Sequence, residues 1–155
     1  SEMCIRDRFK KFLIITCFIF LFSNNAYSSE SFFLMLKNSK VNVRYGPSFD
    51  YPIKFIYKKK FLPVEIIDKK ENFRRIIDHK KNSGWIHISQ LQKVKSAITL
   101  NDINIFKKPS KFSKPVVKAK TGRLLLVKKC EKSWCKIETG KYSGWVEVRN
   151  LWGRN

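Results

Sequence analysis

The stretch GWIHISQL at residues 84–91 decides the fold, because it recurs as GWVEVRNL at residues 144–151. A second pair of matching segments lies upstream of these copies, VNVRYGPS at residues 41–48 and INIFKKPS at residues 103–110. The members of both pairs are separated by almost the same length of chain. Self-similarity at a nearly fixed spacing identifies the structural unit of a repeat protein. The chain therefore consists of two related units in tandem.

Each unit carries the pattern of short antiparallel strands. Residues 40–44 (KVNVR) alternate between polar and apolar side chains, which is typical of a strand with one buried face. The Gly-Pro-Ser that follows and then Pro52 predict a loop. The same reasoning predicts strands at residues 63–68, 73–78 and 84–88 in the first unit and at residues 102–106, 123–129, 133–138 and 144–148 in the second.

The remaining segments predict connections. Pro109 and Pro115 flank a loop in the second unit, and residues 89–91 predict a single helical turn. The connector at residues 92–99 has neither Gly nor Pro, so we expect a strand shared by the two units. No stretch predicts an amphipathic helix. Many short strands with regular turns favour an all-β fold of small barrels or sandwiches.

The N-terminal segment at residues 1–28 has the pattern of export rather than of a folded domain. Residues 1–7 (SEMCIRD) resemble the translated end of a transposon adapter used in preparing sequencing libraries. A basic stretch at residues 8–11 precedes an apolar run at residues 12–22, and the small-x-small sequence at residues 26–28 resembles a cleavage site. Together they predict a secretory signal peptide.

A transmembrane anchor is the alternative to a signal peptide. The apolar run is about half the ~20 residues that span a bilayer as a helix, so we expect cleavage near Ser28 and no transmembrane segment afterwards. The protein is then periplasmic or secreted, with a first domain at residues 29–95 and a second at residues 96–155.

Export also predicts the state of the cysteines. Removal of residues 1–28 leaves Cys130 and Cys135, an even number in an oxidising compartment, which predicts a disulfide between them. Half of a zinc site is the alternative, but His79 and His87 lie in the other unit. We therefore expect a Cys130–Cys135 disulfide and no metal.

The chain is strongly basic, with 33 Lys and Arg against 12 Asp and Glu and a formal charge of +21. Such an excess favours an anionic partner, whether nucleic acid, lipid headgroups or acidic polysaccharide. An equally weighted alternative is drift toward A/T-rich codons, because Lys, Ile, Asn and Phe are all abundant. The lysines are spread along both units, which indicates a solvated surface more than one focused patch.

The motifs taken together resemble bacterial SH3-like (SH3b) domains. The resemblance rests on NVRxGPS at residues 42–48 and on the two GW[IV]xxxxL segments. The tandem arrangement, the export signal and CEKSWC at residues 130–135 resemble the secreted two-copy SH3-like proteins of proteobacteria. The resemblance implies two small five-stranded barrels. In the second copy Phe106 replaces the arginine and Lys108 the glycine of the motif, which favours the first unit as the binding unit.

Candidate binding residues follow from the loop that lines the ligand groove of SH3-like barrels. Tyr45, Phe49, Tyr51 and Trp85 lie in or beside this loop, and aromatic surfaces suit sugar rings and extended peptides. We expect Tyr45 and Tyr51 to be exposed. Trp85 and its counterpart Trp145 have an alternative role in the core or at a barrel end. His87 is expected to be a surface strand residue, and His79 to lie in a polar turn.

No catalytic constellation is recognisable. The carboxylates are scattered, the glycines sit at turns or strand starts, and Cys130 and Cys135 are best explained as partners. We expect no catalytic residues and no cofactor. The resemblance implies a non-catalytic binding protein whose partner is a cell-wall polymer (peptidoglycan) or an envelope protein or peptide. The alternative is a nonspecific polycation that binds lipopolysaccharide or nucleic acid. Peripheral contact with the anionic envelope is compatible with either hypothesis. Nucleic acid is the less favoured partner, because the lysines are spread along the chain.

Overall fold

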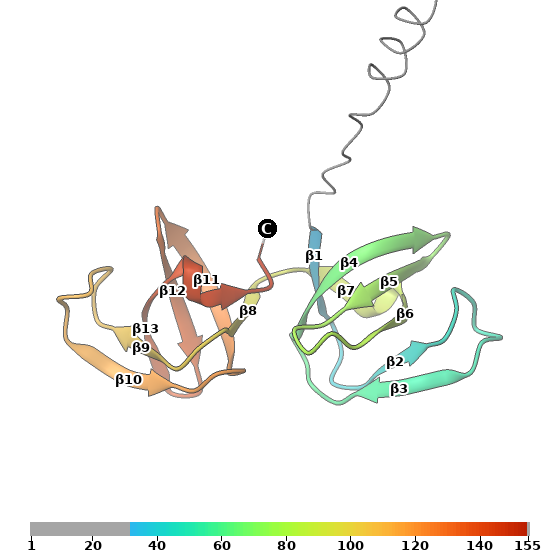
Figure 1. The fold of residues 1–155 in the computed structure, drawn as a ribbon, viewed down its shortest axis with the longest axis horizontal. Helices are drawn as coiled ribbons and strands as arrows, with labels where there is room; N and C mark the ends of the chain where they lie inside the picture. The colour runs from blue at the N-terminus through green and yellow to red at the C-terminus, as the bar shows by residue number, and fades with distance from the viewer. Residues whose placement is uncertain (1–31, 155) are drawn as a thin grey trace, which may run out of the picture. The chain divides into compact units, whose positions relative to one another are not determined.

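The computed structural model describes residues 32–154, which form two antiparallel sheets of seven strands each and contain no α-helix (Figure 1). The predicted adapter-like start and signal peptide lie outside the described residues. The part of the chain that is described contains no helix long and apolar enough to cross a membrane. The fold is all-β, as the sequence predicts, and each sheet curls into a small barrel (Figure 1).

The first barrel is built in the strand order β3-β2-β6-β5-β4-β1-β7. Its 3₁₀ turn η1 (Ile88–Gln90) separates β6 from β7. The strands are β1 (Phe32–Leu36), β2 (Val41–Arg44), β3 (Ile53–Tyr57), β4 (Pro63–Lys70), β5 (Phe73–Ile77), β6 (Ser83–His87) and β7 (Leu91–Lys93).

The second barrel repeats this plan in the order β10-β9-β13-β12-β11-β8-β14. Its 3₁₀ turn η2 (Val148–Asn150) separates β13 from β14. The strands are β8 (Ser96–Thr99), β9 (Ile103–Phe106), β10 (Pro115–Ala119), β11 (Leu124–Glu131), β12 (Trp134–Thr139), β13 (Tyr142–Glu147) and β14 (Leu151–Trp152).

The sequence-based prediction missed four strands, β1, β3, β10 and the two-residue β14. β3 and β10 lie at sheet edges with most of their residues exposed, so neither shows the alternation that reveals a half-buried strand. Pro115 is the first residue of β10, a position where a strand tolerates proline. β1 is an unbroken apolar segment (FFLML), which also hides the period of two. These strands, together with β7 and β8 of the connector, bring each sheet to seven, where the resemblance implied five.

The connector differs from the single shared strand that the sequence predicts. It forms two strands separated at residues 94–95: β7 pairs with β1 in the first sheet, and β8 pairs with β11 and β14 in the second. Each half of the connector therefore belongs to a different sheet.

The period-two pattern of β2 places its apolar residues in the core. Val41 and Val43 are buried together with Val64, Ile76 and Ile86 in the first barrel. The second barrel has an equivalent core of Ile105, Leu125, Ile137 and Val146. Burial of such side chains contributes about 1.5–3 kcal/mol each relative to full exposure.

The repeated Gly-Trp pair reflects a close approach of two strands. A Cβ at Gly84 would collide with the side chain of Val43, and a Cβ at Gly144 would lie 2.6 Å from the carbonyl oxygen of Phe106. Glycine therefore allows β6 to reach β2 and β13 to reach β9, where the pairs Arg44–Trp85 and Phe106–Trp145 form.

Cys130 and Cys135 form the predicted disulfide. They stand directly opposite each other on β11 and β12, with 4.0 Å between their Cα atoms. Cys135 is fully buried in the second core. In the first barrel Lys69 and Arg74 occupy the positions that correspond to the two cysteines, so there is no disulfide between these strands.

A candidate ligand groove in the first barrel

The outer face of β2 forms the floor of a groove. Because Val41 and Val43 point into the core, Asn42 and Arg44 point outward. They pair across the sheet with Ile56 and Ile53 of β3. A register shift between Val43 and Arg44 passes over one residue of β3, so both isoleucines face the same side as the polar residues of β2.

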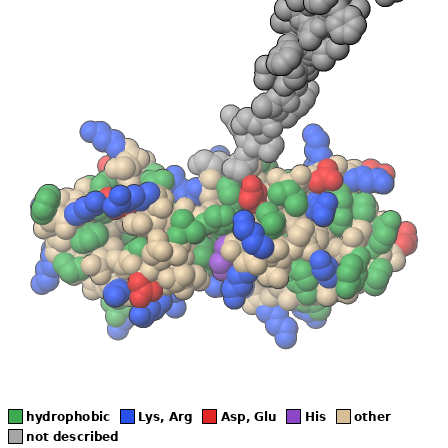
Figure 2. Space-filling view, in the orientation of Figure 1, with side chains coloured by type: hydrophobic (Ala, Val, Ile, Leu, Met, Phe, Trp, Pro, Cys, Tyr) green, Lys and Arg blue, Asp and Glu red, His purple; other side chains and the backbone are tan. Residues whose placement is uncertain are grey.

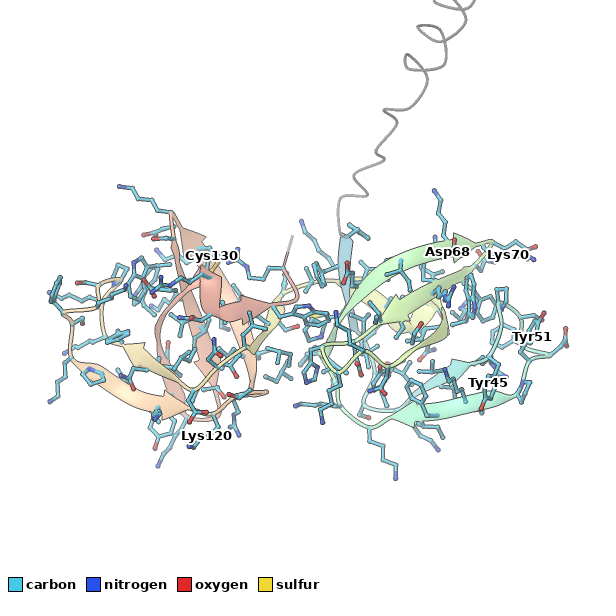
Figure 3. The ribbon with its side chains drawn as sticks, viewed as in Figure 1. Tyr45, Tyr51, Asp68, Lys70, Lys120 and Cys130 are labelled. Carbon is cyan, nitrogen blue, oxygen red and sulfur yellow. A yellow bond between two sulfur atoms is a disulfide. The ribbon has the colours of Figure 1, made fainter. Side chains whose placement is uncertain are left out.

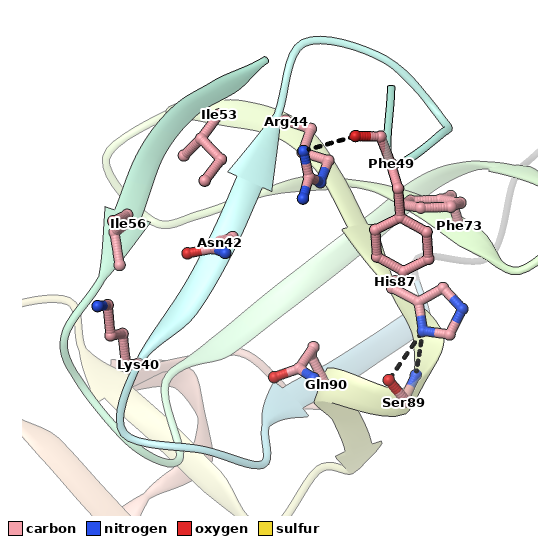
Figure 4. A pocket seen from close by; sticks show the side chains of 10 residues that line it. All are labelled: Lys40, Asn42, Arg44, Phe49, Ile53, Ile56, Phe73, His87, Ser89 and Gln90. Atoms are coloured by element: carbon pink, nitrogen blue, oxygen red, sulfur yellow. Dashed lines mark hydrogen bonds between the residues drawn. The ribbon is translucent and has the colours of Figure 1, made fainter. Parts of the chain in front are cut away.

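The groove has a volume of about 430 Å³, within the range of small-ligand sites. Its ten lining residues come from β2, the residue that precedes it, β3, the loop between these strands, β5, β6 and η1 (Figure 4). The apolar members are Phe49, Ile53, Ile56 and Phe73, and the polar members are Lys40, Asn42, Arg44, His87, Ser89 and Gln90.

Three rings form a cluster at one side of this groove. Phe73 and His87 face each other across β5 and β6, and their ring centroids are 5.2 Å apart in an edge arrangement. Phe49 closes the cluster, with its ring 5.2 Å from each of the other two. Phe73 is buried, whereas Phe49 remains 64% exposed. The three-ring cluster of Phe49, Phe73 and His87 therefore offers an aromatic surface to a ligand.

Arg44 fastens the loop that carries Phe49. Its Nη1 donates hydrogen bonds to the carbonyl oxygens of Phe49 at 3.0 Å and Tyr51 at 2.7 Å. Its guanidinium also lies over the Phe49 ring, 5.3 Å from the centroid. These contacts hold the loop against β2 and position Phe49 beside the groove, so the arginine of the NVRxGPS motif acts as a positioning residue.

Of the four residues predicted from the sequence, the structure places Phe49 in the groove. Tyr45 and Tyr51 belong to the same loop (Figure 3), but they are not among the residues that line the groove. Both are exposed as predicted, at 61% and 47%. Tyr51 packs its ring against Gly46, where a Cβ would lie 2.5 Å away.

Trp85 also lies outside the groove lining. It stands on the outer face of β6, because the fully buried Ile86 beside it points inward. Trp85 and Trp145 are half-buried and belong to neither core, so a role for them in the core is wrong. The assignment of Tyr45, Tyr51 and Trp85 to ligand binding stays a prediction.

The sequence-based interpretation missed most of the groove. His87 was expected to be an ordinary surface strand residue, yet it is half-buried in the three-ring cluster. The alternation KVNVR could have identified Lys40, Asn42 and Arg44 as candidates, because it places these three residues on the same outer face. What the sequence did not reveal was β3, the strand that forms the opposite wall.

A comparison with protein families identifies the family to which both domains belong. The model of the bacterial SH3 domain matches the chain twice in tandem, at residues 37–93 and 101–153. The chain belongs to the bacterial SH3 domain family. Both predicted SH3-like units are thereby confirmed as family members.

Two solved structures match this pair of bacterial SH3 domains distantly. One is described as the structure of NlpC2 from Trichomonas vaginalis; it is 13% identical with a TM-score of 0.39, and the match covers 79% of this chain and 48% of that one. NlpC1 from the same organism is 14% identical with a TM-score of 0.36, over 84% and 49% of the two chains. The chain thus spans about half the length of either. No curated protein matches it significantly.

The second bacterial SH3 domain differs at the positions that form the groove. Strand register and the Pro-Ser pairs make Lys111 the counterpart of Phe49, and Glu147 the counterpart of His87. These two form an ion pair of 3.4 Å. Phe106 replaces Arg44 and packs edge-on against Trp134, the counterpart of Phe73, at 5.9 Å. A salt bridge thus replaces the exposed part of the three-ring cluster.

A buried carboxylate stabilises the first domain away from the groove. Asp78 is 2% exposed and accepts hydrogen bonds from the Tyr57 hydroxyl, the Lys80 and Asn82 amides and the Asn82 side chain, all at 2.9 Å. Burial by itself would raise the pKa of Asp78, but these hydrogen bonds outweigh it and hold the pKa below its ordinary value. Burial and the same carboxylate raise the pKa of Tyr57.

Positive charge is not confined to the groove. Figure 2 shows lysine and arginine side chains scattered over the visible face of the described residues, with a few acidic side chains among them. Among residues 32–154, no three His, Cys, Asp or Glu side chains gather closely enough to hold a metal ion.

Proposed function

We propose that the protein is an exported, non-catalytic adaptor that attaches to cell-wall material, peptidoglycan, or to an envelope protein through its first bacterial SH3 domain. Bacterial SH3 domains are binding domains and are often cell-wall binding. The observation that carries the proposal is the groove beside the three-ring cluster, which combines exposed apolar surface with convergent polar groups. Sites of that composition suit a chain of sugars and peptides.

The absence of catalysis is part of the proposal. Within the described residues, His87 is the groove's histidine, and no Cys, Asp or Glu lines the groove beside it. A nucleophile activated by a base needs two such groups within hydrogen-bond reach. The cysteines of the described chain are joined in a disulfide. The groove does bring His87 within 2.8 Å of the Ser89 hydroxyl, but no carboxylate lines it to orient the imidazole, so we propose binding without catalysis.

The predicted signal peptide and the Cys130–Cys135 disulfide support a periplasmic or secreted location, since disulfides persist in oxidising compartments. This location is where a peptidoglycan or envelope partner is accessible. Mass spectrometry of the exported protein tests it: we expect a chain that begins near Ser29 and contains no free thiol.

Co-sedimentation with purified peptidoglycan tests binding. We expect the protein to sediment with peptidoglycan at physiological ionic strength and to lose at most about tenfold in affinity when salt is raised, because contacts through apolar and aromatic surface are weakly screened. Loss of all binding near physiological salt, with equal retention on DNA or lipopolysaccharide, would overturn the proposal.

A nonspecific polycation is the second candidate. The formal charge of +21 favours it, together with the scattered lysines. Binding of this kind weakens steeply with salt, because each neutralised phosphate releases counterions. It also depends on total charge and not on any one residue, so substitutions within the groove separate the two candidates.

A further inference from the structure

The residues that line the groove carry an unbalanced charge. Lys40 and Arg44 are cationic, and none of the ten lining residues is acidic. Arg44 is engaged by the carbonyl oxygens of Phe49 and Tyr51. Lys40, by contrast, forms no hydrogen bond or ion pair with any residue between 32 and 154, and it lies at the opposite end of β2 from Arg44 (Figure 4). One end of the groove therefore presents an uncompensated ammonium group beside Asn42.

His87 adds a hydrogen-bond donor. Its Nδ1 accepts from the backbone N–H of Ser89 at 3.3 Å and lies 2.8 Å from the Ser89 hydroxyl. Because Nδ1 is an acceptor, the proton of the neutral ring resides on Nε2. The three-ring cluster thus includes an N–H donor as well as apolar surface, and the groove holds several donors without a competing carboxylate.

The second domain carries acids at the corresponding positions. Asp102 stands where the first domain has Lys40, and Glu147 stands where it has His87. Both acids are paired within the domain: Asp102 lies 2.7 Å from Lys120, and Glu147 lies 3.0 Å from Arg149. The acids at these two positions of the second domain are thus neutralised within the domain, and the uncompensated ammonium group of Lys40 has no counterpart there.

We propose that the groove of the first domain recognises a carboxylate-bearing peptide segment of the cell wall. The ammonium group of Lys40 binds the carboxylate, with Asn42 as a neighbouring donor, and Ile53, Ile56 and Phe49 pack against the apolar part of the peptide. The peptide chains of peptidoglycan carry free carboxylates, so the charge complementarity selects the peptide rather than the sugar. This inference rests on the proposed binding of the protein to peptidoglycan.

The test uses the exported protein and two probes: native peptidoglycan, and peptidoglycan whose carboxylates have been converted to methylamides by carbodiimide coupling. We expect binding to fall at least about tenfold on the amidated probe. Lys40→Asp should lose about tenfold on native peptidoglycan and bind the amidated probe as the unsubstituted protein does. The substitution should be tolerated, because Asp102 occupies the same place in the second domain.

Lys132→Asp is the matched control. Lys132 is exposed in the turn between β11 and β12, and it has no ion pair or hydrogen bond among the described residues. The change in net charge is identical, so we expect less than a twofold change in binding. Lys40→Ala against Lys132→Ala repeats the comparison without adding an acid, and it keeps the test valid if Lys40→Asp lowers the thermal midpoint.

The outcomes separate the two proposals. If the unsubstituted protein does not bind native peptidoglycan, the proposed function fails. If it binds native and amidated probes equally, or if the Lys40 and Lys132 variants lose binding equally, the function stands and carboxylate recognition by this groove is wrong.

Discussion

The ring of Phe49 lies against the ring of His87, with centroids 5.2 Å apart and planes inclined by 33°. The two are 38 positions apart in the sequence, yet both contact Phe73 and line the groove. In the second domain their counterparts Lys111 and Glu147 form a salt bridge of 3.4 Å instead. The first domain therefore exposes an aromatic surface at this place, whereas the second domain has a salt bridge there.

Phe49→Ala tests the role of this pair in binding. The ring is 64% exposed, so its removal should lower the free energy of unfolding by about 1 kcal/mol or less, the size of an aromatic pair. Binding to peptidoglycan should fall by about tenfold, because exposed aromatic anchors dominate binding energy. Co-sedimentation and thermal unfolding of the same preparation measure both effects.

The chain supplies a matched control in Phe112, which is fully exposed in the corresponding loop of the second domain. Phe112→Ala should leave binding unchanged. Tyr45→Ala and Tyr51→Ala locate the site more finely: if they weaken binding while Phe49→Ala does not, the ligand contacts the loop tip and not the groove.

Two adjacent residues of β6 should respond differently to truncation. Ile86 is fully buried, so Ile86→Ala should cost about 2–5 kcal/mol of stability. Trp85 is half-buried on the outer face, and Trp85→Ala should cost about 1–2 kcal/mol, within the ordinary range for single substitutions. Urea unfolding of each variant measures the difference; a larger loss for Trp85 than for Ile86 would contradict the assigned faces.

The disulfide should stabilise the second domain alone. Closing the short loop between Cys130 and Cys135 contributes about 2 kcal/mol on the chain-entropy model. Reduction should therefore lower the unfolding temperature of the second domain and leave amide hydrogen exchange in the core of the first unchanged. Equal loss of protection in both domains would refute a local role.

The first domain offers a designed counterpart. Lys69 and Arg74 pair in the register that the cysteines occupy in the second domain. Lys69→Cys combined with Arg74→Cys should form a disulfide under oxidising conditions and slow exchange in the first domain. A variant that remains reduced would show that the two hairpins differ in geometry.

Asp78 predicts acid sensitivity of the first domain. Its pKa is lowered in the folded state, so it contributes stability above the pKa of the unfolded chain, about 3.9. That stability is lost as the pH falls below about 4 and passes through the folded pKa. Asp78→Asn should lower stability at pH 7 by about 2–3 kcal/mol, the cost of losing charge-assisted hydrogen bonds, and should flatten the acid dependence.

Urea titrations between pH 3 and pH 7, followed through amide signals of the first domain, measure this dependence. Asp68→Asn is the control, because Asp68 is exposed on β4. If the free energy of unfolding of Asp78→Asn falls with pH as steeply as that of the unsubstituted protein, Asp78 is not the cause of the acid sensitivity.

The repeat and the alternation KVNVR were sufficient to predict the fold class, the pairing of two SH3-like units and the core face of β2. The edge strands β3 and β10 were not predictable, because apolar residues lie on their outer faces as well as on their core faces, which hides the period of two. The groove depends on β3 for one wall. For this reason Phe49 could be nominated from its loop, whereas His87 could not be linked to Lys40 and Asn42.

Trp85 illustrates a second limit of the sequence. A tryptophan repeated at the same place in both units suggested a core position, but the glycine beside it is what the fold requires. Gly84 permits the close approach of β6 to Val43, whereas Trp85 remains on the outer face. The repeated Gly-Trp pair shows that the fold constrains this position, but the sequence does not indicate whether the glycine or the tryptophan is the residue that the fold requires.

The central claim is that the groove of the first bacterial SH3 domain holds the ligand. Titration of the isotope-labelled exported protein with soluble peptidoglycan fragments, followed by amide chemical shifts, tests it most directly. The account predicts that the largest shifts cluster at Asn42, Phe49, His87 and Gln90 and saturate together. Shifts that cluster in the second domain, or that spread over the lysines of both domains without saturating, would contradict it.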